Sequence, residues 1–434
     1  MSRHMKDSGI EWVGEVPNAW GIFPAKYAFS EIREKNKDGI ITNALKFFNG
    51  TIVPKTNFDA DSDDYVADVI TNYTIVEPDT IMINGLNLNY DLKSLRVGLV
   101  RETGVITSAY LAIKPDQGRI LPQYAMYLFK GYETRMAFHN MGAGIRKTLG
   151  FKEFKYQPIL VPSLNEQKRI VSFLDAECDC IDSIIRKTEE SIENYKKLRQ
   201  SLIKRSVTRG VRGNRAMKHS GISFIGDVPK EWDVKRTKYI ADSLSKGSGI
   251  TKDDVKEDGD IQCVRYGEIY SKYDGAFFST YSRTNESAIS SPKYLEKGDI
   301  IFACTGELIE EIGKNIVYLG DEPCLAGGDI IVMQHSQNPI FLNYSLNSIC
   351  SQEQKSLGKT KLKVVHISAG EIGNVFVALP PLEEQVEIAN YLNEKCGEID
   401  RTIEAKKGIV DELLLLKKSF IFEYATGKKE VPHS

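Results

Sequence analysis

Two basic stretches have the composition of loops that contact phosphate. In residues 141–149, Gly142 and Gly144 precede Arg146 and Lys147. Glycine lets a backbone approach another group closely, both cations neutralise phosphate, and arginine can also pair with two acceptors of guanine in the major groove. We interpret this stretch as a candidate nucleic-acid contact. The alternative is a solvated loop.

Residues 358–363 occupy the corresponding position in the second half of the chain. They carry Lys359, Lys361 and Lys363. Alternate residues of a strand point to the same side, so these three lysines would share one face. The spacing therefore indicates a second phosphate-contacting turn, with the same alternative.

A cluster of basic and aromatic residues is a third candidate. Arg265 and Tyr266 are followed closely by Lys272 and Tyr273. Such residues could contact nucleic acid through charge and ring stacking. They could equally be edge-strand residues that cover a core.

Two further segments are weaker candidates. Asn84 and Asn87 lie in an asparagine-rich run whose amides could read the edge of adenine or could stabilise a turn. Residues 196–215 hold eight lysines and arginines and no acidic residue. That run could follow a DNA backbone or contact a partner, or it could be a solvated helix end where cations suit the helix dipole.

The motifs of an enzyme that acts on ATP or DNA are missing. Gly358, Lys359 and Thr360 resemble the end of a P-loop, but Glu353 stands where the first glycine is required. The Asn-Pro-Pro-aromatic and Asp-Pro-Pro-aromatic tetrapeptides of amino-methyltransferases do not occur, and no histidine has metal-ligand spacing to a cysteine. We predict no catalytic residue, no metal site and no cofactor in this chain.

The composition is typical of a globular protein. The 434 residues have a formal net charge of −2, so nucleic-acid binding would depend on local clusters. No run of eighteen apolar residues and no signal peptide is present. Seven cysteines without a CxxC pair suit a reducing compartment. We expect a cytoplasmic protein of two or three domains without disulfides.

The strongest periodic pattern predicts two long helices that would position these candidates. Apolar residues recur at spacings of three, four or seven within residues 165–208, and the pattern returns about 218 residues later. The predicted seam residues are Leu174, Cys178, Ile181, Ile185, Ile192, Tyr195 and Leu202 in the first helix, and Leu392, Cys396, Ile399, Ile403, Val410, Leu413 and Phe420 in the second. The linker that follows the first helix reaches at most roughly 40 Å, less than a helix of roughly 65 Å. We therefore expect an antiparallel pair.

A duplicated segment indicates two copies of one module. Residues 8–20 read SGIEWVGEVPNAW, and residues 220–232 read SGISFIGDVPKEW. Two copies of this size are not a solenoid, whose repeats are far shorter. We exclude residues 1–6 from the fold as a tag remnant or a weakly ordered start, because the repeat begins at Ser8.

Each copy alternates short strand-like runs with turns and then contains a helix. In the first copy we predict strands in residues 44–48, 80–84, 95–101 and 110–114, and a helix over residues 122–140. Its stripe of Tyr124, Tyr127, Leu128 and Met136 is predicted to be core. In the second copy we predict strands in residues 261–266, 299–303, 314–318 and 328–333, and a helical stretch over residues 340–355.

The predicted fold class is α+β. Two globular modules are separated by two long helices packed as an antiparallel coiled coil, and the whole forms a pseudo-two-fold internal repeat. The predicted boundaries are 1–163 for the first module, 164–213 for the first long helix and linker, 214–381 for the second module, and 382–434 for the second long helix and tail. The helices match each other better than the modules do, which favours two recognition heads on one frame.

These features together resemble the specificity subunit of Type I restriction-modification systems. The resemblance rests on the duplicated Ser-Gly-Ile, Val-Pro and Trp landmarks and on residues 379–382, which read LPPL before the second helix. Residues 265–270 (RYGEIY) and 297–302 (KGDIIF) also look like motifs of one class of recognition domain in that family. The first helix departs from the pattern, since VPSL stands in residues 161–164.

The resemblance implies a role without catalysis. Each module would be a target-recognition domain that reads one half of a bipartite double-stranded DNA target. The helices would set the spacing and dock methyltransferase subunits, and restriction subunits could join the complex. S-adenosylmethionine, ATP and magnesium would be used by those partners. The alternative is a structural adaptor whose two modules bind proteins.

Overall fold

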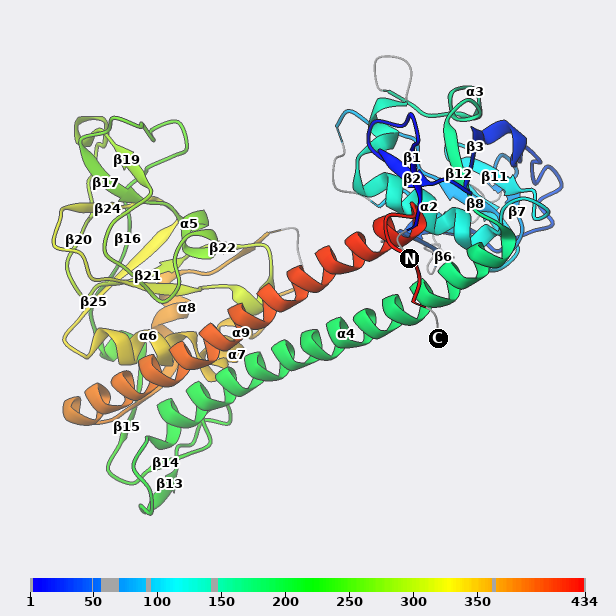
Figure 1. Ribbon diagram of the computed structural model, residues 1–434. Helices are drawn as coiled ribbons and strands as arrows, with labels where there is room; N and C mark the ends of the chain where they lie inside the picture. Colours follow the sequence, from blue (N-terminus) through cyan, green and yellow to red (C-terminus); the bar gives the residue numbers. More distant parts are fainter. Residues whose placement is uncertain are drawn as a thin grey trace. The chain divides into compact units, whose positions relative to one another are not determined.

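The computed structural model describes residues 3–48, 50–55, 70–90, 95–141, 147–360 and 364–432. The chain divides into two compact units. The first comprises Met1–Glu189 and Gly408–Ser434, and the second comprises Glu190–Lys407. Each unit contains one globular head and a part of each long helix (Figure 1). We call residues 5–161 the first head and residues 217–379 the second head.

The two long helices predicted from the sequence are present. Helix α4 spans Leu164–Arg209 and helix α9 spans Leu382–Ala425. Residues 164–189 of α4 belong to the first unit and residues 190–209 to the second. Among the described residues, no helix is both long and apolar enough to cross a membrane.

Within the first unit the helices run antiparallel. The rings of Phe173 and Tyr424 lie 4.5 Å apart, and Lys417 Nζ lies 2.6 Å from Asp182 Oδ1. Residue numbers rise along α4 while those of the contacted residues fall along α9. The antiparallel prediction is therefore confirmed for this unit.

The second unit repeats the arrangement. Arg199 Nε lies 3.0 Å from Asp400 Oδ1, and Ile192 packs with Ile399 and Ile403 in a small buried cluster. Of the predicted seam residues, Leu174, Cys178, Ile181, Ile192, Leu392, Cys396, Ile399 and Ile403 are buried. The half-buried ones are Ile185, Tyr195, Leu202, Val410, Leu413 and Phe420.

The first head contains one four-stranded sheet and several two-stranded sheets, whose short strands pair antiparallel. Its central sheet has the order β4-β11-β8-β9, formed by Phe29–Glu31, Leu111–Pro115, Ile81–Ile83 and Val97–Leu99. Two-stranded sheets pair β5 (Leu45–Phe48) with β6 (Thr51–Pro54), β7 (Thr74–Val76) with β10 (Gly104–Ile106), and β3 (Gly21–Pro24) with β12 (Pro158–Val161). The helical elements are η1 (Ala25–Tyr27), α2 (Pro122–Thr134), η3 (Ala137–Asn140) and α3 (Phe151–Phe154). Helix α2 covers the sheet at β8 and β9.

The second head has two larger sheets. One has the order β16-β25-β21-β23-β18, formed by Ala241–Lys246, Ile330–His335, Ile300–Ala303, Asn315–Tyr318 and Ala276–Phe277. The other has the order β19-β17-β24-β20, formed by Ser282–Thr284, Ile261–Val264, Cys324–Ala326 and Tyr294–Leu295. Pairs join β15 (Asp233–Arg236) to β27 (Phe376–Leu379) and β22 (Thr305–Gly306) to β26 (Val365–His366). The helical elements are η4 (Thr237–Tyr239), α5 (Tyr266–Ser271), η5 (Glu286–Ala288), η6 (Ile309–Glu311), α6 (Pro339–Asn347), α7 (Ile349–Ser356) and α8 (Ala369–Asn374).

The exclusion of residues 1–6 was wrong. Strand β1 (Met5–Asp7) pairs with β2 (Glu15–Pro17), as β13 (Met217–His219) pairs with β14 (Asp227–Pro229) in the second head. The repeat therefore starts before Ser8, because Met5-Lys6 matches Met217-Lys218 at the same offset of 212.

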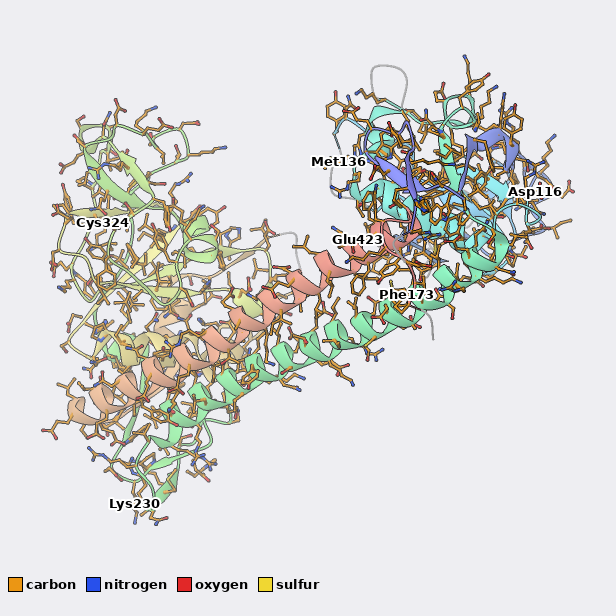
Figure 2. All side chains as sticks on the ribbon, in the orientation of Figure 1. Asp116, Met136, Phe173, Lys230, Cys324 and Glu423 are labelled. Atoms are coloured by element: carbon orange, nitrogen blue, oxygen red, sulfur yellow. The ribbon has the colours of Figure 1, made fainter. Side chains whose placement is uncertain are left out.

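One predicted helix ends earlier than expected and another is divided in two: α2 ends at Thr134, and α6 and α7 meet at Ser348. Met136 adopts a left-handed conformation after α2 and is 46% exposed, so its assignment to the core was wrong (Figure 2). The stretch over residues 340–355 is two helices, because the Ser348 hydroxyl accepts the Ser351 N–H and starts α7. The strand predicted over 261–266 ends at Val264, where α5 follows.

Each head is tied to the ends of its long helices by the same four residue types, which are arginine, tryptophan, glutamate and glycine. In the first unit the Arg3 guanidinium lies 5.6 Å from the Trp20 ring and forms an ion pair with Glu166 at the start of α4. Gly427 follows the end of α9 with a φ of +75°, and a Cβ there would come within 2.9 Å of the Trp20 ring. The buried tryptophan thus contacts the end of one long helix and holds the arginine that binds the start of the other.

The second unit contains the equivalent junction. Arg215 lies 5.6 Å from the Trp232 ring, and both donate to the buried Glu384 at the start of α9. The Trp232 Nε1 to Glu384 Oε2 distance is 3.0 Å. Gly210 follows α4 with a φ of +74°, and a Cβ there would lie 3.1 Å from Trp232. The duplicated tryptophan is therefore a joint between head and frame.

Removing Arg215 should loosen the second junction. An Arg215→Ala variant leaves the carboxylate of Glu384 buried with only the indole as a partner, which should cost about 2 kcal/mol of local stability. Hydrogen-exchange mass spectrometry of peptides from residues 200–235 would measure it. The control is Arg212→Ala, because Arg212 pairs with Glu387 at the surface and should change exchange little. Equal effects of the two variants would contradict the role given to Arg215.

Candidate nucleic-acid interface

The asparagine-rich run of the first head forms a turn directly after the central strand β8. Asn84 is half-buried, and its Oδ1 accepts the Leu86 N–H at 3.2 Å. Asn87 is exposed and has a φ of 52°. The turn interpretation therefore applies to the amide of Asn84, whereas the side chain of Asn87 faces solvent.

A buried arginine holds this turn from beneath. Arg96 is fully buried, and its Nη1 donates to the carbonyl oxygens of Asn84 and Leu86 at 2.9 and 2.8 Å. Its backbone N–H donates to the carboxylate of Glu133, whose pKa is raised to about 7 by burial, against the opposing effect of this hydrogen bond. Sequence reasoning missed Arg96, although a lone cation in the apolar run 95–100 is a signal of a paired buried charge.

The structure brings the basic turn of the first head to the same place. The Leu88 N–H donates to the Lys147 carbonyl oxygen at 3.2 Å, and the Leu149 N–H donates to Gly85 O at 2.9 Å. Lys147 is exposed and has a φ of 39°. Gly142, Gly144 and Arg146 lie outside the described residues.

The second head builds the equivalent position from different residues. The Ile367 N–H donates to Cys304 O at 2.9 Å, just after β21, and β22 pairs with β26 beside it. Thr305 Oγ1 and His366 Nδ1 are 3.1 Å apart. Leu149 and Ile367 are separated by 218 residues, the same offset as the long helices. In both heads, the loop after the central strand therefore meets the segment that follows the basic turn.

Two side chains of α7 donate hydrogen bonds to backbone carbonyls of the loop between β21 and β23. The buried Lys355 donates to Gly313 O at 2.7 Å, and Gln352 Nε2 donates to Ile312 O at 3.1 Å. Burial lowers the pKa of Lys355 to about 7. Sequence reasoning missed both residues.

Lys359 is engaged within the second basic turn. Its ammonium donates to His366 O at 2.6 Å and forms an ion pair with Glu371. The side chain is 15% exposed, so this lysine holds the turn together. Lys361 and Lys363 lie outside the described residues.

The basic and aromatic cluster of the second head surrounds the short helix α5. Arg265 precedes the helix, and its N–H donates to Glu268 Oε2 at 2.8 Å, while Tyr266 is 39% exposed. The edge-strand alternative was wrong, because Tyr266 begins a helix. Tyr270 connects α5 to the loop after β21, since its hydroxyl donates to Glu311 O at 3.4 Å.

The second half of that cluster separates into exposed and buried parts. Lys272 is exposed, with its Nζ 5.4 Å from the Tyr281 ring. Tyr273 is buried in the core, and its hydroxyl accepts the Tyr281 N–H at 3.1 Å. Tyr281 is 70% exposed and was missed by sequence reasoning. Lys272 and Tyr281 therefore form the surface pair, and Tyr273 supports it.

A family model describes this chain. The model for the Type I restriction modification DNA specificity domain matches residues 106–194 and 229–415, which is more than half of the chain. The chain belongs to the family of Type I restriction-modification specificity subunits. Its role is therefore DNA specificity, and as a specificity subunit it is not itself an enzyme.

Two curated relatives agree with this assignment. The Type I restriction enzyme MjaVIII specificity subunit of Methanocaldococcus jannaschii is 25% identical over 370 residues, covering 83% of this chain and 82% of the relative. The putative type I restriction enzyme MjaX specificity subunit of the same organism is 22% identical over 436 residues, covering 96% of each.

Two solved structures share the fold of the specificity subunit. A chain from a study of complex assembly and conformational transition in the type I R-M system gives a TM-score of 0.70 at 17% identity, covering 95% of this chain and 99% of that one. The HsdS subunit from Thermoanaerobacter tengcongensis gives a TM-score of 0.51 at 16% identity, with coverage of 95% and 98%.

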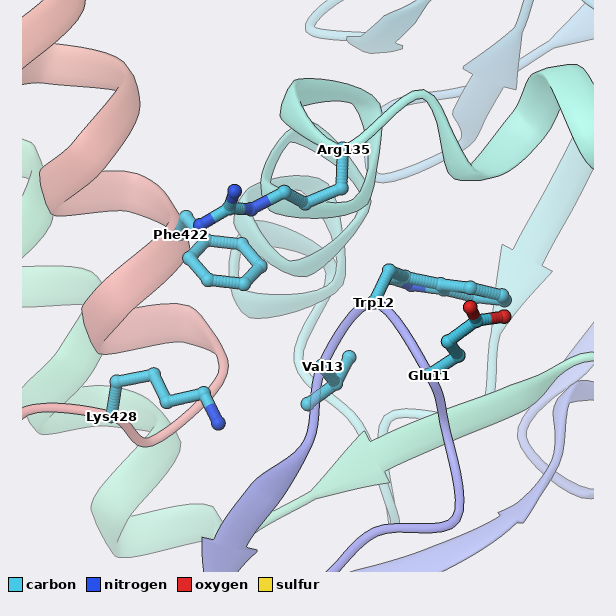
Figure 3. Close-up of a pocket in the computed structure, with 6 residues that line it drawn as sticks. All are labelled: Glu11, Trp12, Val13, Arg135, Phe422 and Lys428. Atoms are coloured by element: carbon cyan, nitrogen blue, oxygen red, sulfur yellow. The ribbon is translucent and has the colours of Figure 1, made fainter.

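A pocket in the first unit lies between the hairpin loop of the repeat, the C-terminal end of α2 and the C-terminal end of α9. None of the predicted site residues lines it. Its volume is about 580 Å³, and Figure 3 shows its lining of Glu11, Trp12, Val13, Arg135, Phe422 and Lys428. The Arg135 guanidinium lies 4.4 Å from the Phe422 ring. In the part of the chain that the structure describes, no group of three or more His, Cys, Asp or Glu side chains could hold a metal ion.

Enlarging Gly85 should separate the two elements of the first candidate interface. A Cβ at Gly85 would overlap the Leu149 carbonyl oxygen and lie 2.9 Å from Leu149 Cβ. We expect a Gly85→Ala variant to fold but to lose at least tenfold in DNA affinity at the half-site read by the first head. Gly249→Ala is the control, because its Cβ would meet no atom within 4 Å. Fluorescence anisotropy with each half-site altered in turn would measure the effect, and unaltered binding would contradict the assignment.

Proposed function

We propose that each head reads one half of a bipartite double-stranded DNA target. The interface would combine the loop after the central strand, residues 84–90 or 304–314, with the adjacent basic turn. The observation that carries the proposal is that both heads join these two elements by the same backbone hydrogen bond, Leu149 to Gly85 and Ile367 to Cys304. Base-edge contacts give specificity, and phosphate contacts fix the register. Asn87 supplies an exposed polar group within the first loop. Tyr266 and Lys272 supply exposed polar groups at the two ends of α5, which Tyr270 joins to the second loop.

We further propose that the long helices act as a spacer and as the docking surface for methyltransferase subunits. In this division, residues 1–163 and 214–381 are the recognition domains, and residues 164–213 and 382–434 are the spacer segments. Exposed apolar side chains on the helices of the first unit support protein contact. They are Leu164, Ile184, Ile409, Leu414, Leu415 and Leu416.

Catalysis would belong to the partners in this proposal. Methyltransferase subunits would use S-adenosylmethionine, and a restriction subunit, where present, would use ATP and magnesium. The complex would act on DNA in the cytoplasm. An adaptor that binds only proteins would also use two heads on a frame, but it has no need of matched basic turns.

Mapping methylated bases in a host that carries this chain and its methyltransferase tests the function. We expect one bipartite motif with a fixed spacer. An inactive methyltransferase variant with the same specificity subunit controls for other enzymes of the host. A contiguous motif would refute the reading of two half-sites. No methylation, together with no salt-dependent DNA binding by the assembled complex, would favour the adaptor.

Lengthening both helices by seven residues tests the spacer. The insertions would lie between Glu189 and Glu190 and between Lys407 and Gly408, the boundaries of the two compact units. Seven residues are two turns, so the apolar seam keeps its phase. We expect a longer spacer in the methylated motif with both half-sites unchanged. An unchanged spacer with altered half-sites would refute the ruler role.

A further inference from the structure

Both heads display the same Lys-Tyr pair in the same one-turn helix. Lys26 and Tyr27 lie in η1, and Lys238 and Tyr239 lie in η4, at the repeat offset of 212. Tyr27 is 54% exposed and Tyr239 is 71% exposed. Each lysine ammonium lies over the neighbouring tyrosine ring, at 5.0 Å in the first head and 5.2 Å in the second.

These pairs contribute little to the stability of the heads. Both lysines are exposed, and within the described residues neither lies within ion-pair distance of a carboxylate. Tyrosine is intermediate in burial among the residue types, so exposure alone is ordinary. It is the recurrence of one exposed lysine and tyrosine pair at equivalent positions that points to a shared contact. The heads differ in their sheets and in their candidate base-reading loops. The exposed Lys-Tyr pair is common to both heads, so it suits a ligand that both heads contact.

A second cation and aromatic pair lies beside the first in each head. In the first head, Lys155 Nζ is 4.8 Å from the Tyr156 ring, which Lys26 also approaches at 5.5 Å. In the second head, the Arg236 guanidinium is 5.0 Å from the Phe376 ring. Each Lys-Tyr turn is therefore part of a small basic surface.

The Lys-Tyr turn of the first head is connected to the candidate interface by one short helix. Lys26 N–H donates at 2.9 Å to the carbonyl of Lys155, the residue that follows α3. Helix α3 begins two residues after Leu149, the residue bonded to Gly85. The Gly150 N–H donates to Glu153 Oε2 at 3.2 Å, which fixes the start of α3.

The second head has the same connection. Thr237 N–H donates at 2.8 Å to the carbonyl of Val375, the residue that follows α8. Helix α8 begins two residues after Ile367, and the Ser368 N–H donates to Glu371 Oε2 at 2.8 Å. In both heads a single short helix therefore runs from the base-reading loop to the Lys-Tyr turn.

We propose that the two Lys-Tyr turns are equivalent contacts to the DNA phosphates next to each half-site. The inference rests on the proposed function and adds a contact that does not depend on base sequence. Phosphate is the same in every half-site, so heads that read different bases can keep one residue pair for it. The ammonium and the phenol both donate hydrogen bonds to phosphate oxygens, and the ring holds the ammonium in place.

Salt dependence of binding tests this assignment in the full complex with its methyltransferase. We expect the Lys26→Ala, Lys238→Ala double variant to bind every target more weakly by the same factor. The slope of log affinity against log salt concentration should become shallower by about 2, because each lost phosphate contact contributes about 0.9. The ratio of specific to non-specific binding should stay within about twofold. The Lys26→Arg, Lys238→Arg variant should keep the original slope.

The matched control is the Lys114→Ala, Lys297→Ala variant. It makes the same change in net charge, one lysine in each head, and each of these side chains is 59% exposed and paired with a surface carboxylate. An equal change of slope in the control, or no change in the test variant, would overturn the inference. So would normal DNA affinity with failure to assemble with the methyltransferase, since the turns would then be a protein contact. If the wild-type complex binds no DNA, the proposed function fails before the variants are compared.

Discussion

The rest of the structure depends on an ion pair between an arginine and a glutamate in each unit, beside a tryptophan. Both partners are half-buried in the first unit, and the glutamate is buried in the second. Glu166 and Glu384 stand at the starts of the two long helices, where a carboxylate also suits the helix dipole. Each is paired with an arginine from just before the β-hairpin of the repeat. Loss of the arginine would leave the Glu384 carboxylate buried and the Glu166 carboxylate half-buried without its ion pair, so the pair fixes the start of each helix to its head. The sequences around Trp20 and Trp232 are therefore similar because both must form the same junction between a head and the long helices.

A glutamine next to each glutamate extends the joint toward the head. Gln167 Oε1 accepts the Leu121 N–H at 2.7 Å, and its amide donates to Pro162 O at 2.9 Å. Gln385 accepts from the Asn338 N–H at 3.0 Å and donates to Pro380 O at 2.9 Å. Leu121 and Asn338 precede α2 and α6, so each glutamine links a long helix to the start of one helix of the head. Each of these hydrogen bonds joins a glutamine side chain to a backbone group. The side chains on the surface of the head can therefore differ without breaking them.

The long helices could be predicted from the sequence because apolar residues at spacings of three, four and seven fall on one face of an α-helix and not of a strand. The strands could be placed for a similar reason, whereas Met136 could not, since nothing in its type signals a left-handed residue. The candidate site was predicted only in part. Asn84, Lys147 and Lys359 were found as polar loop residues, but their contacts are long-range, and Arg96 and Lys355 act through carbonyl oxygens that have no sequence signature. Nothing in the residue type of Lys26 or Lys238 signals a contact, and both lie beyond the duplicated landmarks, which end at Trp20 and Trp232.

The two heads brace the same loop by unrelated means that have one property in common. In the first, Arg96 donates to the carbonyl oxygens of Asn84 and Leu86. In the second, Lys355 and Gln352 donate to the carbonyl oxygens of Gly313 and Ile312. A brace that binds only the backbone fixes the path of the loop and is indifferent to its side chains. Loop side chains can therefore change, and with them the bases that are read, without altering how the loop is held. That separation is the physical condition for one frame to carry different specificities.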